Sequence, residues 1–133
     1  RAELEGLAAR LFTERASAEQ NQALRETLVE LATAIREGKS SKQILTAQAE
    51  FYRVLFEGAR NPFLERTVQG MQVRIAQLRA TTLAVPGRAE ASLEEFEQIF
   101  QSIAASDPEA ARHAAVEHVR RAGEAMARSR TPA

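Results

Sequence analysis

Apolar residues recur every three or four positions along most of the chain, and this spacing limits the fold more than any other feature. Leu24, Leu28, Leu31 and Ile35 form one such stripe, and the pattern continues through residues 64–78. A repeat near 3.6 residues places apolar side chains on one face of an α-helix. The alternation typical of half-buried strands is missing. The chain is therefore predicted to be all-α.

Capping signals show where these helices begin. A serine followed three residues later by Gln or Glu, the capping box, occurs at Ser17–Gln20, Ser40–Gln43 and Ser92–Glu95. An Asn or Asp directly before proline, at Asn61 and Asp107, marks two further starts. Joined by short turns, such helices form a mostly antiparallel bundle. We predict six of them, at residues 1–15, 18–37, 41–58, 62–84, 92–105 and 108–128.

Length and charge narrow the class of protein. A chain of 133 residues accommodates a single domain, here predicted to span residues 1–133. It has no cysteine, which excludes disulfides and thiolate metal sites. Its 18 basic and 18 acidic residues balance, so no net field attracts nucleic acid or anionic lipid. With no apolar run of membrane-spanning length and no signal peptide, the prediction is a cytoplasmic domain that binds no membrane.

Signatures of enzymes are missing. The chain contains no P-loop, no G-x-G-x-x-G, no G-x-S-x-G and no H-E-x-x-H. A di-iron bundle needs Glu-x-x-His on two helices, and neither His113 nor His118 has a glutamate three residues before it. Glu94, Glu95 and Glu97 are explained as carboxylates at the positive end of a helix dipole. The chain is predicted not to be an enzyme and to hold no cofactor.

A few polar residues interrupt the apolar stripes. Gln48 and Tyr52 lie one helical turn apart between Ile44 and Leu55, and His118 holds a similar position on the last predicted helix. Buried amide, phenol and imidazole groups must find hydrogen-bond partners. These residues indicate either a polar cavity inside the bundle or a self-satisfied polar network in the core, and the sequence leaves both interpretations open.

Motifs in a fixed order connect the chain to a known family. They are RAELEGLAARL at 1–11, FYRVL at 51–55 followed by NPFL at 61–64, EFEQI at 95–99, and Asp107 and Ala111 followed by His118-Val119. Taken together they resemble the C-terminal FCD domain of GntR-type transcription regulators in the FadR-like branch. The resemblance covers nearly the whole chain. It implies a FadR C-terminal domain-like bundle that senses a ligand and forms a homodimer.

The resemblance also has implications for metal binding. Many members of this family bind a divalent metal through an Asp and a His four residues apart and one His on each of the last two helices. The corresponding positions here are Gln48, Tyr52, Phe96 and His118. Phenylalanine has no lone pair, and neutral Gln and Tyr are poor ligands for zinc or nickel. We therefore predict that the metal site is degenerate and that no metal is bound.

The same positions define the expected effector pocket. We expect it to contain Gln48, Tyr52, Phe96 and His118, with Arg74 and Arg1 able to reach an anionic group. The implied partner is a small organic effector, such as a carboxylate or an acyl compound. DNA would be bound only through an N-terminal winged helix-turn-helix domain outside this chain. The alternative is a structural helical dimerisation domain with no ligand.

Overall fold

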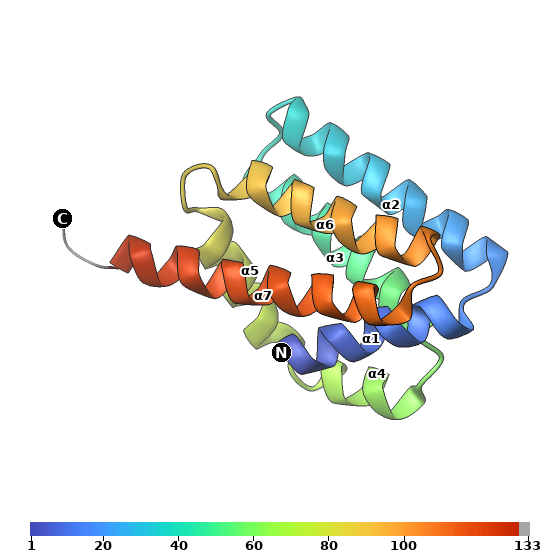
Figure 1. Cartoon of the computed structure of the whole chain (residues 1–133). Helices are drawn as coiled ribbons and strands as arrows, with labels where there is room; N and C mark the ends of the chain where they lie inside the picture. The colour runs from blue at the N-terminus through green and yellow to red at the C-terminus, as the bar shows by residue number, and fades with distance from the viewer. Residues whose placement is uncertain (131–133) are drawn as a thin grey trace.

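The chain folds into a bundle of helices. The structure, a computed structural model, describes residues 1–130, and within that range it contains seven helices and no strand (Figure 1). They are α1 (Ala2–Arg15), α2 (Ala18–Arg36), α3 (Ser41–Gly58), α4 (Pro62–Gln69), α5 (Gln72–Leu83), α6 (Arg88–Ala104) and α7 (Pro108–Arg130). The all-α prediction is confirmed. No helix within residues 1–130 is long and apolar enough to cross a membrane.

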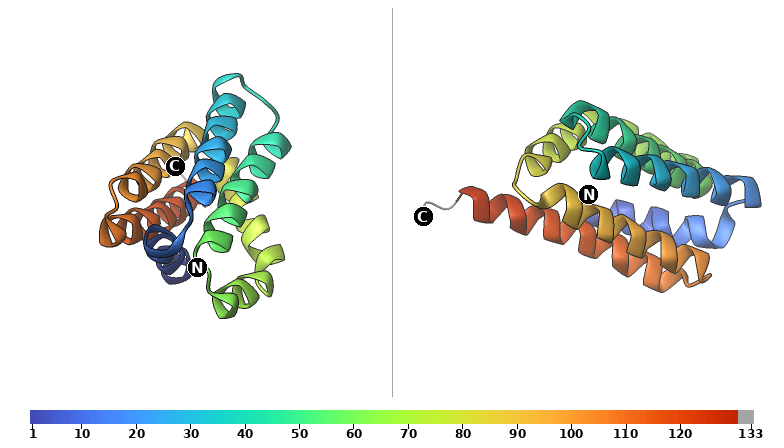
Figure 2. Two further views of the ribbon diagram at one scale, coloured as in Figure 1. Left: turned by 90° about the vertical axis from the view of Figure 1, so that its right-hand side faces the viewer. Right: turned by 90° about the horizontal axis from the view of Figure 1, so that it is seen from above.

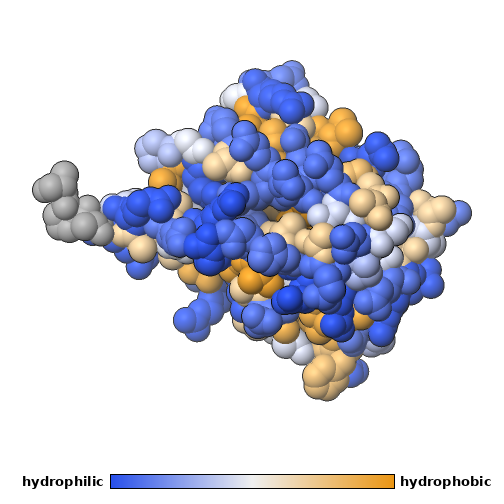
Figure 3. Space-filling view, viewed as in Figure 1, coloured by the Kyte–Doolittle hydropathy of each residue, from blue (hydrophilic) through white to orange (hydrophobic). Residues whose placement is uncertain are grey.

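The helices form two layers with a short pair at one side. Helix α7 lies between α1 and α6, and α2 packs along α3 (Figures 1 and 2). Contacts of α1 with α3 and of α2 with α6 join the two layers, and α4 and α5 cover the remaining side of α3. Hydrophilic residues predominate on the face formed by α6 and α7 (Figure 3). The buried faces of the helices therefore point toward a shared interior.

The segment predicted as one helix over 62–84 is two helices. Helix α4 ends at Gln69 and α5 begins at Gln72, with Gly70 and Met71 between them. Glycine has a low helix propensity because its backbone loses the most freedom on folding. The apolar spacing persists across the break, which is why periodicity alone did not reveal it. The break allows α5 to approach α7 while α4 contacts α1.

Helix α6 begins four residues earlier than predicted. Gly87 adopts a left-handed conformation with φ of 79°, and Arg88 is the first helical residue. The Ser92 hydroxyl donates to the Ala89 carbonyl instead of capping a helix, so the predicted capping box at this place is wrong. The capping boxes at Ser17 and Ser40 are confirmed, each with both reciprocal bonds. The early start turns Glu95 from a first-turn residue into an interior one.

Large side chains from several helices fill the core. The largest fully buried ones are Phe12, Phe51, Phe96, Leu24, Leu31, Leu55 and Ile99. The Phe96 ring of α6 meets the Phe51 and Tyr52 rings of α3 edge-on, with centroids 4.9 and 5.6 Å apart. This aromatic cluster holds α6 against α3, and it lies next to the polar side chains of the interior.

We predict opposite effects for two glycine substitutions. A Cβ on Gly58 would collide with the buried ring of Phe12, where α3 approaches α1. Gly58→Ala should lower the free energy of unfolding by about 1–3 kcal/mol through overpacking. In the matched control Gly123→Ala, the new methyl group lies in open space at an exposed position of α7. This change should raise the free energy of unfolding by about 0.5–1 kcal/mol. Urea unfolding followed by circular dichroism measures both, and equal effects would contradict the described contact of α1 with α3.

Candidate functional site

Polar side chains from four helices meet in the bundle interior. They surround a cavity of about 20 Å³, which is room for one water-sized group. Helices α3, α5, α6 and α7 and the residue preceding α1 contribute to its wall. Its main polar lining residues are Arg1, Gln48, Tyr52, Arg79, Arg88 and His118.

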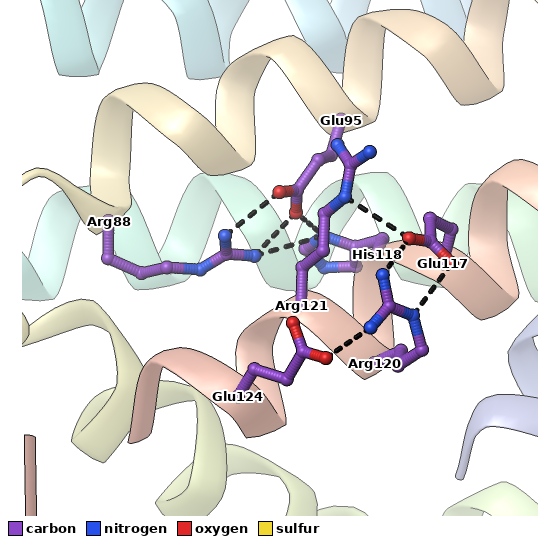
Figure 4. A network of polar contacts seen from close by, with 7 residues as sticks. All are labelled: Arg88, Glu95, Glu117, His118, Arg120, Arg121 and Glu124. Atoms are coloured by element: carbon purple, nitrogen blue, oxygen red, sulfur yellow. Dashed lines mark hydrogen bonds and ion pairs between the residues drawn. The ribbon is translucent and has the colours of Figure 1, made fainter. Parts of the chain in front are cut away.

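A buried ion cluster forms one wall of this cavity. Arg88 donates two hydrogen bonds to the Glu95 carboxylate, at 2.9 Å to Oε2 and 2.5 Å to Oε1. His118 Nδ1 lies 2.6 Å from the same Oε1 (Figure 4). All three side chains are about 6% exposed. Because an ionised carboxylate only accepts hydrogen bonds, the His118 ring carries its hydrogen on Nδ1.

The cluster keeps Glu95 ionised. Burial alone would raise the pKa of this carboxyl group, but the hydrogen bonds from His118 and Arg88 outweigh that cost, and the pKa of Glu95 is lowered. Arg88 Nη2 lies 3.5 Å from His118 Nδ1, so a fixed positive charge stands beside the imidazole. The ion cluster therefore joins the first turn of α6 to its second turn and to the middle of α7.

A second polar cluster lies between α1, α3 and α5. Arg1 Nε donates to Glu5 Oε2 at 2.7 Å, and the Arg79 guanidinium lies over the Tyr52 ring at 3.8 Å from its centroid. Burial, and secondly the nearby Glu5 carboxylate, raise the pKa of Tyr52, so its phenol stays neutral. Three atoms here are buried without a hydrogen-bond partner within the described residues, namely Tyr52 Oη, Glu5 Oε1 and Arg79 Nε.

The structure brings most of the predicted site residues together. Arg1, Gln48, Tyr52 and His118 line the cavity. Phe96 packs beside it, with its ring 4.7 Å from the His118 ring. Arg74 differs from expectation, because it is exposed on α5 and lies outside the cavity wall.

Sequence reasoning missed Glu5, Arg79, Arg88 and Glu95. Glu95 matched a helix-start pattern and was explained by it, and Arg88 fell in the segment expected to be a loop. For Arg79 a signal was available, since it follows Ile75 by four residues and therefore shares its face of α5. Choosing between Arg74 and Arg79 required the exact rotation of α5, which depends on the break at Gly70 and Met71.

Comparison with known proteins gives a family and a structural neighbour. The FCD domain family model matches residues 1–121. Among solved structures, E. coli McbR/YncC resembles this chain with a TM-score of 0.82 at 21% sequence identity. The similarity covers 98% of this chain and 62% of that one, so this chain spans about three-fifths of its length. No curated protein sequence matches the chain.

We predict that the Glu95 cluster makes the free energy of unfolding depend on pH. A lowered pKa in the folded state means stabilisation above the unfolded value of about 4.3, lost as pH falls through the folded value. Glu95→Gln should therefore destabilise the chain at pH 7 by about 1.5–3 kcal/mol, the usual contribution of hydrogen bonds to a charged group. The difference from the unmodified chain should shrink below pH 4.

Urea unfolding between pH 7 and pH 3 measures this difference. Glu94→Gln, an exposed change one residue away on the same helix, is the control and should change the pH profile little. The prediction would be contradicted if the free energies of unfolding of the Glu95→Gln chain and the unmodified chain differed by the same amount at every pH.

Proposed function

We propose, because the chain belongs to the FCD domain family, that it is the effector-binding and dimerisation domain of a GntR-type transcription regulator of the FadR-like branch. The observation that carries this proposal is the polar cluster around the interior cavity, where Arg79 Nε is buried without a partner within the described residues and Arg79 also lines a groove of about 650 Å³ beside α3. Leaving a buried donor or acceptor unpaired costs about 1–3 kcal/mol. A small polar organic molecule that accepts a hydrogen bond from Arg79 Nε would recover that cost.

The proposed partners follow from the family. A homodimer of this domain would present two DNA-binding domains to a two-fold operator. DNA contact would belong to a winged helix-turn-helix domain, because the 18 basic and 18 acidic residues of this chain give it no net attraction for phosphate. The chain's role in regulation would then be to convert effector binding into a change of dimer geometry.

The metal implied by the family resemblance does not fit the residues of this site. Of the four ligand positions only His118 has an imidazole, and because its Nδ1 donates to Glu95 it offers a single nitrogen, too few ligands for a metal site. The Arg88 guanidinium beside this imidazole would repel a second cation. Within residues 1–130 no group of three His, Asp or Glu side chains is arranged to hold a metal ion. We therefore derive no role for a metal in effector binding.

We predict that the purified chain is metal-independent. Elemental analysis of protein prepared without chelator should find far less than one zinc, nickel or manganese ion per chain, because one imidazole supplies only a fraction of a site. The melting temperature should not change on addition of EDTA. Stoichiometric metal, together with a lower melting temperature in EDTA, would refute this interpretation.

The alternative function is a structural dimerisation domain with no ligand. Such a domain gains nothing from unpaired interior groups, and its polar residues should satisfy one another. The Arg88, Glu95 and His118 cluster meets that description, but Arg79 Nε, which is buried without a partner within the described residues, does not. The unpaired Arg79 nitrogen therefore favours the effector-binding function.

We predict that the Tyr52 hydroxyl contributes to effector affinity. After the chain is exposed to cell extract, native mass spectrometry identifies the retained compound, and calorimetry with that compound compares variants. Tyr52→Phe should weaken binding by about 0.5–1.5 kcal/mol, one hydrogen bond, without loss of fold. His118→Ala should weaken it more, because a polar partner and volume are both removed. Retained binding of every effector by both variants would support the structural alternative.

A further inference from the structure

The wall of the inner cavity contains positively charged side chains and no carboxylate. Three arginines line it, namely Arg1, Arg79 and Arg88, and no aspartate or glutamate of residues 1–130 does. The other polar side chains of the wall are Gln48, Tyr52, Thr82, Ser92 and His118. A cavity bordered by guanidinium groups and by no carboxylate attracts an anion and repels a cation.

The carboxylates behind the wall do not cancel all of its positive charge. Glu5 lies 2.7 Å from Arg1 and neutralises it. Glu95 neutralises Arg88 in the same way. Arg79 forms no ion pair within residues 1–130, although its Nε is buried. Three guanidinium charges against two carboxylate charges leave one positive charge. Because a buried charge is unfavourable without a partner, this count matches one monovalent anion.

Unused hydrogen-bond donors lie on the same wall. Gln48 is 6% exposed, and its side chain forms no hydrogen bond within residues 1–130. The hydroxyl groups of Thr82 and Ser92 already donate to carbonyl groups of their own helices. An amide NH₂ and a guanidinium only donate hydrogen bonds. The Gln48 amide and the Arg79 guanidinium are therefore available to an acceptor in the cavity.

The volume of the cavity limits the anion to a single atom. About 20 Å³ is room for one water-sized group. Carboxylate, phosphate and sulfate groups have several heavy atoms and do not fit in this space. A chloride ion is close to a water molecule in size. The sign of the wall and the size of the space together select a halide.

We propose that the inner cavity is a halide site whose occupant is chloride. The ion neutralises the charge left by Arg79 and accepts hydrogen bonds from Arg79 and Gln48. Its sign is opposite to that of a metal ion, which needs carboxylate, thiolate or imidazole ligands. The wall comes from α3, α5, α6, α7 and the residue before α1, so one anion connects all of these elements.

This inference goes beyond the proposed function and does not depend on it. The halide is a structural component of the interior, whereas an organic effector is too large for a space of about 20 Å³. Arg79 also lines the groove beside α3, and its guanidinium has several N–H donors. Arg79 can therefore contact an ion on one side and an effector on the other. Because chloride binds only the folded chain, it should stabilise the fold.

Crystals of the chain grown in sodium bromide locate the ion directly. Bromide resembles chloride in charge and size, and it gives an anomalous signal at the bromine absorption edge. We expect an anomalous difference peak within hydrogen-bond distance of Arg79 and Gln48. Arg79→Gln should lack this peak. Arg74→Gln, which changes an exposed arginine of the same helix outside the cavity wall, should keep it.

Thermal unfolding tests the same site in solution. The melting temperature is compared in sodium chloride and in sodium methanesulfonate, whose monovalent anion is too large for the cavity. Equal ionic strength keeps the screening of surface charges the same. Chloride should raise the melting temperature by about 2–6 °C relative to methanesulfonate. The difference should disappear in Arg79→Gln and remain in Arg74→Gln.

A second pair of variants tests the volume of the cavity without changing its charge. Ala122 is 4% exposed and lines the cavity, so the added methyl groups of Ala122→Val occupy the space of the ion. Ala125→Val is the matched control, because Ala125 is also buried on α7 but does not line the cavity. The chloride-dependent difference should be lost in Ala122→Val and kept in Ala125→Val. Circular dichroism confirms that each variant is folded.

Three results would overturn the proposal. An ordered water in the cavity with no bromide peak would show that the space holds water. A bromide peak without any chloride-dependent change in melting temperature would indicate an adventitious ion only. A chloride effect that persists in Arg79→Gln or in Ala122→Val would place the ion elsewhere on the chain. None of these results affects the proposed effector binding, which is measured separately with Tyr52→Phe.

Discussion

The buried carboxylate of Glu95 is the charge on which the arrangement of the interior depends. An isolated carboxylate in an apolar core is highly unfavourable, so its ion pair with Arg88 and its hydrogen bond from His118 are obligatory. Arg88 can form that ion pair because α6 begins directly after Gly87. Arg88 and Glu95 then lie two turns apart on the same helix, and the long Arg88 side chain reaches the carboxylate. The link between α6 and α7, the orientation of the His118 ring and one wall of the inner cavity follow from this neutralised charge.

The same cluster explains how this chain departs from the metal-binding members that its sequence resembles. A guanidinium provides a fixed positive charge close to the retained imidazole, and a ring of Phe96 occupies another of the former ligand positions. The Glu95 cluster therefore remains electrostatically balanced with side chains alone. Arg79 forms no ion pair within residues 1–130, and its guanidinium lies against the face of the Tyr52 ring.

Much of the fold could be predicted from the sequence because its signals are local. Apolar spacing identified the helices, and the reciprocal hydrogen bonds at Ser17 and Ser40 marked two starts correctly. The same local pattern at Ser92 and Glu95 gave the wrong start, since a long-range ion cluster outweighed a cap that contributes about 1 kcal/mol. Gln48, Tyr52 and His118 were found because they interrupt apolar stripes. Arg88 was missed because nothing local separates it from the other arginines of the chain, and Arg79 was missed because choosing it over Arg74 requires the exact rotation of α5.

The break at Gly70 and Met71 gives α5 an independence that its neighbours lack. Its N-terminal end is joined to α4 by a two-residue turn, and its C-terminal end leads through residues 84–87 to the left-handed Gly87. Helix α5 is therefore a separate short helix between two short connections, and its position depends on its contacts with α3, α6 and α7. It carries Arg79 over Tyr52 and also contacts α7, so α5 connects the interior polar cluster beside α3 to the longest helix of the domain.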